Sequence, residues 1–177
     1  MIPDGCVADV NLAPMAAHSF VWVRVHCVWT TYRRQPLLEP DWQERLYRYL
    51  SGVARRKGAL LLCAGGVRDH IHLYLSLPPD RSIASLVNAL KANSSRWIHA
   101  PFPHHRLFAW QTSYAAFSVS QRSEQRLISY ILSQEQHHRR EQVRRELERL
   151  LDRHGMRPAR PPFSSHRPVR KHGAYPE

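Results

Sequence analysis

The chain has 177 residues, which leaves room for one domain with its own hydrophobic core. Its 26 Lys and Arg residues outnumber its 14 Asp and Glu residues, giving a formal net charge of +12. Such an excess favours a polyanionic partner, with nucleic acid first and an anionic membrane surface as the alternative. The three cysteines are widely spaced, with no C-x-x-C pair, which argues against a disulfide framework and a zinc knuckle. No apolar run approaches the roughly 18 residues of a membrane span, and no signal-peptide pattern opens the sequence, so we expect a cytoplasmic protein without a membrane segment.

Three regions of different composition follow one another along the chain. Residues 1–17 show little periodicity and are expected to form a flexible leader, whereas residues 18–154 carry the patterned apolar residues of one folded domain. Residues 155–177 are rich in Pro and Arg and too poor in apolar residues to fold alone, so we expect a basic, disordered tail. Residues 139–177 hold 11 basic and 5 acidic residues, which is +6 of the net +12, so the preceding part is basic in its own right.

Strand-like and helix-like patterns succeed one another in the folded region. The expected elements are a strand at 18–31, a helix at 41–57, two hairpin strands at 59–64 and 69–77, a helix from 82, an extended stretch at 107–120 and a helix from 123 through 138, with 154 as its furthest end. Asp41 and Glu44 are predicted to cap the first helix, Gly65-Gly66 to form the hairpin turn and Ser123 to cap the third helix. This order predicts an α+β fold with an antiparallel sheet of four to five strands covered by helices.

His70 and His72 are separated by one residue in an extended segment, so both project from the same face of a strand. Ile71 and Leu73 alternate onto the opposite face, where they can pack as core. Two imidazoles on one face can hold one divalent metal ion. On its own, a His-x-His pair is more often structural than metal-binding.

On the third predicted helix, Tyr130, Gln134 and His137 fall to one side of the apolar stripe, with His138 on its border. The stripe consists of Leu127, Ile128, Ile131 and Leu132. A tyrosine that served only the core would lie in the middle of such a stripe. The helix alone still favours an ordinary amphipathic surface tyrosine beside a polar i+4 neighbour.

Four ordered segments resemble the single-tyrosine transposases of small bacterial insertion sequences. They are residues 65–72, which contain the HUH motif (His, bulky apolar residue, His), and residues 91–98, 110–120 and 130–139. The resemblance covers about residues 18–155 and implies the ferredoxin- or RRM-like HUH palm fold with a C-terminal catalytic helix. Residues 18–154 would then be the HUH transposase catalytic domain. The basic tail departs from the short C-terminus with tyrosine and tryptophan that is typical of relatives.

The resemblance implies that Tyr130 cleaves and rejoins single-stranded DNA at hairpin-bearing element ends through a 5′-phosphotyrosine. The ordinary pKa of tyrosine is about 10, so charge at the phosphate must be neutralised. A divalent ion, Mg²⁺ or Mn²⁺, held by His70 and His72 would do so, and the family's glutamine corresponds to Gln134 as a third ligand. The resemblance also implies a homodimer in which the tyrosine helix of one subunit completes the site of the other.

Several further residues carry two interpretations. Lys91 and Arg96 on the second helix and His138 on the third could contact DNA phosphates, although charges on the wet face of a helix are common. A binding module without catalysis, or a domesticated relative, is the alternative function. An RNA-recognition domain would stack bases on exposed sheet aromatics, whereas the corresponding face here offers two histidines and Tyr74.

Overall fold

The computed structural model describes residues 21–99, 108–134 and 143–156, without the side chains of 143–147. Its antiparallel sheet has the order β2-β3-β1-β4. The strands are β1 (Arg24–Thr30), β2 (Leu60–Val67), β3 (His70–Ser76) and β4 (Ala115–Ser118). The helices are α1 (Pro40–Arg56), α2 (Ile83–His99), α3 (Glu124–Leu132) and α5 (Val143–Arg153), with short 3-10 turns at Tyr32–Arg34 and Gln121–Ser123. The predicted α+β class is confirmed, with four strands in the described part of the chain.

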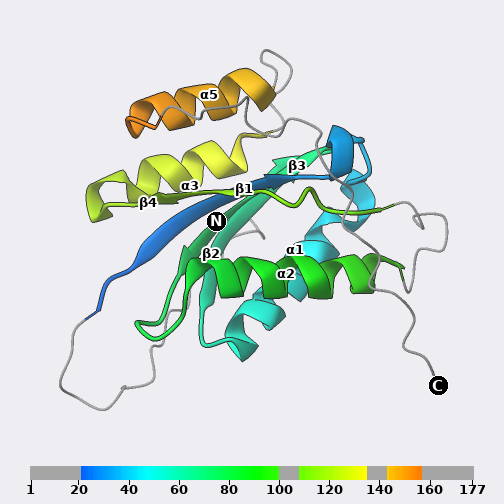
Figure 1. Cartoon of the computed structure of the whole chain (residues 1–177), viewed down its shortest axis with the longest axis horizontal. Helices are drawn as coiled ribbons and strands as arrows, with labels where there is room; N and C mark the ends of the chain where they lie inside the picture. Colours follow the sequence, from blue (N-terminus) through cyan, green and yellow to red (C-terminus); the bar gives the residue numbers. More distant parts are fainter. Residues whose placement is uncertain (1–20, 100–107, 135–142, 157–177) are drawn as a thin grey trace.

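Helices cover both faces of this sheet (Figure 1). On one face α1 and α2 pack on the apolar side of β1 and β3, where Cys27, Ile71 and Leu73 are fully buried. On the other face lie α3 and α5, which contact the sheet through smaller clusters around Tyr74 and Phe117. All residues of β1 are buried, so the central strands have no open face among the described residues.

Two predicted boundaries were wrong. The first strand begins at Arg24 and not at residue 18; of the residues before it that the structure describes, 21–23 are exposed and lie outside the ladder. The first helix is capped by the backbone of Glu39 with Pro40 in its first turn, and the cap residue makes no side-chain hydrogen bond. Proline is favoured at the first helical position, because the N–H that it lacks would have no partner within the helix. The helix therefore begins at Pro40, and Asp41 lies inside it and does not cap it.

The glycine pair was wrongly placed in the hairpin turn. The turn is Arg68-Asp69, and Gly65 and Gly66 lie within β2, opposite His72 and Ile71. A Cβ atom on Gly65 would stand 2.3 Å from the carbonyl oxygen of Ile131. Gly65 therefore lets the backbone of α3 approach the sheet closely.

The third predicted helix is not continuous in the described residues. α3 ends at Leu132, and α5 is a separate helix beside it (Figure 1). A straight helix from 124 to 154 would be about 45 Å long and would carry Leu150 away from Val28 and Phe117, against which it packs. Ser123 makes no capping bond, since its hydroxyl is 2.9 Å from that of Ser120.

The predicted leader 1–17 and almost all of the predicted tail 155–177 lie outside the described residues. None of the helices that the structure describes is long and apolar enough to cross a membrane.

Candidate active site

His70 and His72 lie on the face of β3 that α3 and α5 cover, and both are fully buried. Their ring centroids are 5.0 Å apart with the planes nearly perpendicular. The predicted alternation is confirmed, because Ile71 and Leu73 point into the opposite core. The sequence thus places two imidazoles side by side in an interior that excludes bulk water.

A polar neighbour fixes each of these rings through its Nδ1 atom. His70 Nδ1 is 2.7 Å from Asp69 Oδ1, and His72 Nδ1 is 3.0 Å from His26 Nε2. Burial opposes ionisation of Asp69, but its contacts with His70 and Arg34 outweigh burial and lower the pKa of the carboxyl. Since both Nδ1 atoms are engaged, Nε2 is the nitrogen through which either ring would ligate a metal.

His26 is a site residue that the sequence reasoning missed. It lies on β1 and is 2% exposed. Burial, with a smaller contribution from the charge of His154, lowers its pKa to about 3, so the ring is neutral and its Nε2 can accept a hydrogen bond from His72. The sequence signal for this residue was a histidine within the apolar run 25–29. Only the pairing of β1 with β3 shows that its ring lies beside His72.

Tyr130 extends from α3 toward these histidines. Its ring centroid is 5.6 Å from that of His72 and 6.4 Å from that of His26, edge-on in both cases. Ile131, next in sequence, is buried against the sheet, while Tyr130 itself is half-buried. Tyr130 packs against the same cluster as Leu127 and Ile128, so its predicted offset from the apolar stripe stays a prediction.

Gln134, two residues beyond the end of α3, is 1% exposed, and its Nε2 donates to the carbonyl of Tyr130 at 3.4 Å. This bond orients the amide so that its oxygen is the atom that could serve as a ligand. Within the described residues no three His, Cys, Asp or Glu side chains form a metal-binding group. The predicted donor set of two imidazoles and an amide is of a different kind and stays a prediction.

Tyr74 is the other tyrosine on this face of the sheet, beside the histidines on β3. It is fully buried. Burial, together with the nearby Glu124 carboxylate, raises its pKa to about 12. Tyr74 is thus a poorer nucleophile than a tyrosine at the edge of a cavity.

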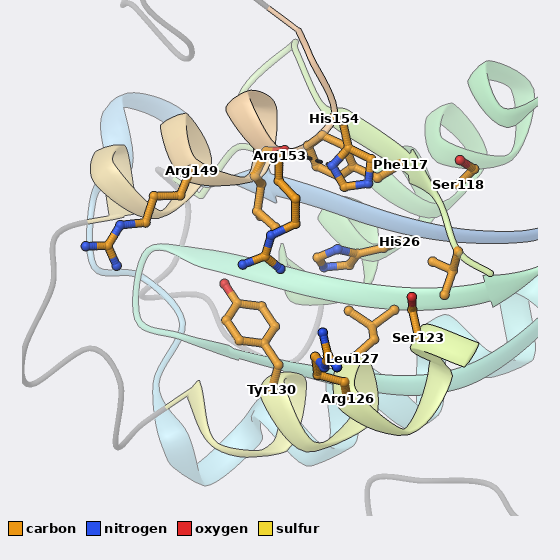
Figure 2. A pocket seen from close by; sticks show the side chains of 12 residues that line it. His26, Phe117, Ser118, Ser123, Arg126, Leu127, Tyr130, Arg149, Arg153 and His154 are labelled. Carbon is orange, nitrogen blue, oxygen red and sulfur yellow. Dashed lines mark hydrogen bonds between the residues drawn. The ribbon is translucent and has the colours of Figure 1, made fainter. Parts of the chain in front are cut away.

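A cavity of about 450 Å³ opens between α3, β4 and α5, with Tyr130 on its wall. Figure 2 shows the Tyr130 hydroxyl pointing into this space from α3, with Arg153 reaching toward it from α5. The polar lining residues are His26, Ser118, Ser123, Arg126, Tyr130, Arg149, Arg153 and His154. Tyr130 therefore faces both the buried histidines and a cationic cavity.

The three predicted DNA contacts differ in placement. Lys91 is buried in the α2 layer, and its ammonium donates to the carbonyls of Gln111, Thr112 and Ser113 at 2.8–3.2 Å. Burial lowers its pKa to about 8. This arrangement disfavours a phosphate contact by Lys91. Arg96 is exposed on α2, in the layer opposite Tyr130, and His138 lies outside the described residues.

Comparisons with known proteins agree with the fold. The family of IS200-like transposases matches residues 19–134. The ISDra2 transposase TnpA of Deinococcus radiodurans is 29% identical over 114 residues, covering 62% of this chain and 81% of that protein. A crystal structure of a candidate transposase from Deinococcus radiodurans R1 matches with a TM-score of 0.56 and 26% identity, over 70% of this chain and 98% of that one. A REP-associated tyrosine transposase, solved bound to a REP hairpin, has a similar fold, with a TM-score of 0.51 and 14% identity over 67% and 72% of the two chains.

Proposed function

This chain belongs to the family of IS200-like transposases, and from that premise we propose that it cleaves and rejoins single-stranded DNA through Tyr130. The phenolic oxygen attacks phosphorus, the bond from phosphorus to the 3′ oxygen breaks, and the products are a 5′-phosphotyrosine and a free 3′-OH. The phenolic proton leaves as the bond forms, and one proton ends on the 3′ oxygen. Rejoining is the reverse reaction with another 3′-OH, so no external energy source is needed. The observation that carries the proposal is the 5.6 Å separation of the Tyr130 and His72 rings.

A divalent metal ion is part of this proposal. His70, His72 and Gln134 would hold it, and the donor set fits because two buried imidazoles and an amide oxygen suit Mn²⁺, and Mg²⁺ when water completes the shell. When bound, the ion supplies Lewis-acid neutralisation of charge at the scissile phosphate. Asp69 and His26 hold the two imidazoles in place through their Nδ1 atoms.

The proposed substrate is single-stranded DNA whose ends carry short hairpins. The solved neighbour bound to a REP hairpin supports a hairpin partner, although it shares only the fold with this chain. We also propose a homodimer whose sites are completed in trans, as the family resemblance implies.

A binding protein without catalysis is the second candidate. Stacking of bases on the sheet, as in RNA-recognition domains, would require open aromatics on the central strands. In the described residues α3 and α5 cover that face, and a tyrosine stands beside two histidines there. These observations favour the catalytic proposal.

The direct test is a covalent adduct between protein and DNA. Labelled single strands from both genomic flanks of the reading frame are incubated with protein and either Mn²⁺ or Mg²⁺, and the mixtures are run on a denaturing gel. We expect a slow-migrating adduct that EDTA and Tyr130→Phe both abolish, because the variant loses only the nucleophilic oxygen. Tyr49→Phe is the matched control, since Tyr49 stacks on Trp97 in the opposite helix layer.

An adduct that persists in Tyr130→Phe would contradict the assignment of the nucleophile. If wild-type protein binds the strands on a native gel but forms no adduct with either metal, the binding-protein alternative is favoured instead.

A further inference from the structure

The cavity beside Tyr130 has a strongly basic lining. Arg126 comes from α3, whereas Arg149 and Arg153 come from α5, one helical turn apart. Within the described part of the chain no acidic residue lines this space. Arginine is the side chain best suited to phosphate groups, because its planar fork donates two parallel hydrogen bonds.

The position of α5 is fixed by its own contacts with the sheet. Leu150 packs against Val28 and Phe117, and the His154 ring lies 4.6 Å from that of Phe117, tilted by 32°. His154 Nδ1 donates to the carbonyl of Leu150 at 2.8 Å. These contacts hold the opposite edge of α5 over Tyr130, as Figure 2 shows for Arg153.

The arginines of α5 lie outside the segment that the family shares, which ends at residue 134. Nothing in the tyrosine and histidine chemistry needs them. A cavity of about 450 Å³ falls in the range of ligand sites, roughly 300–1,000 Å³. Its walls also include Phe117, Val119 and Leu127. Apolar walls suit a sugar and base better than a small inorganic anion.

We propose that this cavity is a binding subsite for single-stranded DNA next to the scissile phosphate, in which Arg126, Arg149 and Arg153 hold backbone phosphates. The proposal rests on the proposed function, because Tyr130 must receive a strand for the subsite to serve it. It assigns α5 the task of holding that strand against the nucleophile. The arginines contact phosphate and the apolar walls pack on sugar and base without reading base edges, so the subsite carries no base specificity.

The test measures binding of a fluorescein-labelled thymidine homopolymer by anisotropy over a range of salt concentrations. The variant is Arg149→Gln/Arg153→Gln, and the matched control is Arg55→Gln/Arg56→Gln, an exposed pair in the last turn of α1 on the other side of the sheet. We expect the α5 variant to bind about 10-fold more weakly, with the slope of log K against log salt reduced by about 1.4, since each lost single-strand phosphate contact removes about 0.7. The control should retain wild-type affinity and slope.

Equal weakening in both double variants would overturn the proposal, because it would indicate a general effect of surface charge. A blunt duplex that depends on the α5 arginines as strongly as the single strand does would also overturn it. The adduct assay separates this proposal from the proposed function. If wild-type protein forms the adduct but DNA binding does not depend on the α5 arginines, only the subsite proposal is contradicted. If binding depends on these arginines but no adduct forms, only the catalytic proposal is contradicted.

Discussion

His26 on β1 contacts His72, a proposed metal ligand on β3. It lies diagonally across from His72 in the β1–β3 ladder, where side chains of this length can meet. Its neutral Nε2 lies 3.0 Å from His72 Nδ1, where it can accept a hydrogen bond and so set the tautomer and the orientation of His72. Asp69 does the same for His70 with a carboxylate. The two proposed ligands are therefore oriented without a metal ion.

We expect replacement of His26 to weaken metal binding. His26→Leu keeps the volume but removes the acceptor, so we expect affinity for Mn²⁺ to fall about 10- to 100-fold. His26→Gln keeps an acceptor oxygen and should recover part of that loss. Free Mn²⁺ is measured by electron paramagnetic resonance in titrations of each folded variant. Wild-type affinity in His26→Leu would show that the contact does not orient His72.

Helix α3 carries Tyr130 and depends on a single glycine in β2. Gly65 faces α3, and the Ile131 carbonyl occupies the place of the missing side chain. Ile131 itself packs with Leu62, Cys63 and Tyr74. The close approach of helix and sheet is what brings Tyr130 beside His72.

Gly65→Ala should therefore displace α3. We expect it to lower the free energy of unfolding by about 1–3 kcal/mol through overpacking and to reduce adduct formation at saturating DNA. Gly52→Ala is the matched control. Gly52 lies inside α1, where its Cβ would meet nothing closer than 3.6 Å, so the alanine should stabilise the helix by up to about 1 kcal/mol. Both are measured by urea denaturation and the adduct gel. A Gly65→Ala protein as stable and active as wild type would contradict this account of the helix.

Local pattern was sufficient to predict some elements and insufficient for others. The helical spacing behind residue 40 and the alternation around His70 were readable because each repeats over several residues. The glycine pair looked like a turn because local sequence does not show that a distant helix will pack on it. Lys91 looked like an exposed cation on a helix, yet it binds a loop that follows some twenty residues later. The division between α3 and α5 likewise depends on where Leu150 can find apolar partners.

In the proposed homodimer, the way the two subunits assemble decides which chain supplies the nucleophile. Within one chain, Tyr130 lies beside its own His72. The packing that holds α3 is small: Ile131 is buried, but Leu127 and Ile128 are half-buried and Leu132 is 38% exposed. A short helix held by a small cluster is suited to exchange between identical subunits, and a symmetric exchange rebuilds the same contacts.

Mixing two inactive variants tests this exchange. His72→Ala keeps the tyrosine and Tyr130→Phe keeps the histidines, so in a mixed dimer with exchanged helices one site is complete. After co-refolding equal amounts, half of the dimers are mixed, and we expect an adduct at about one quarter of the wild-type yield, carried on the His72→Ala chain, which a size tag identifies. Each variant alone should give none. Because completion within one chain would leave every site in the mixture without either its tyrosine or its histidine, a verified mixed dimer without adduct would place nucleophile and ligands in the same subunit.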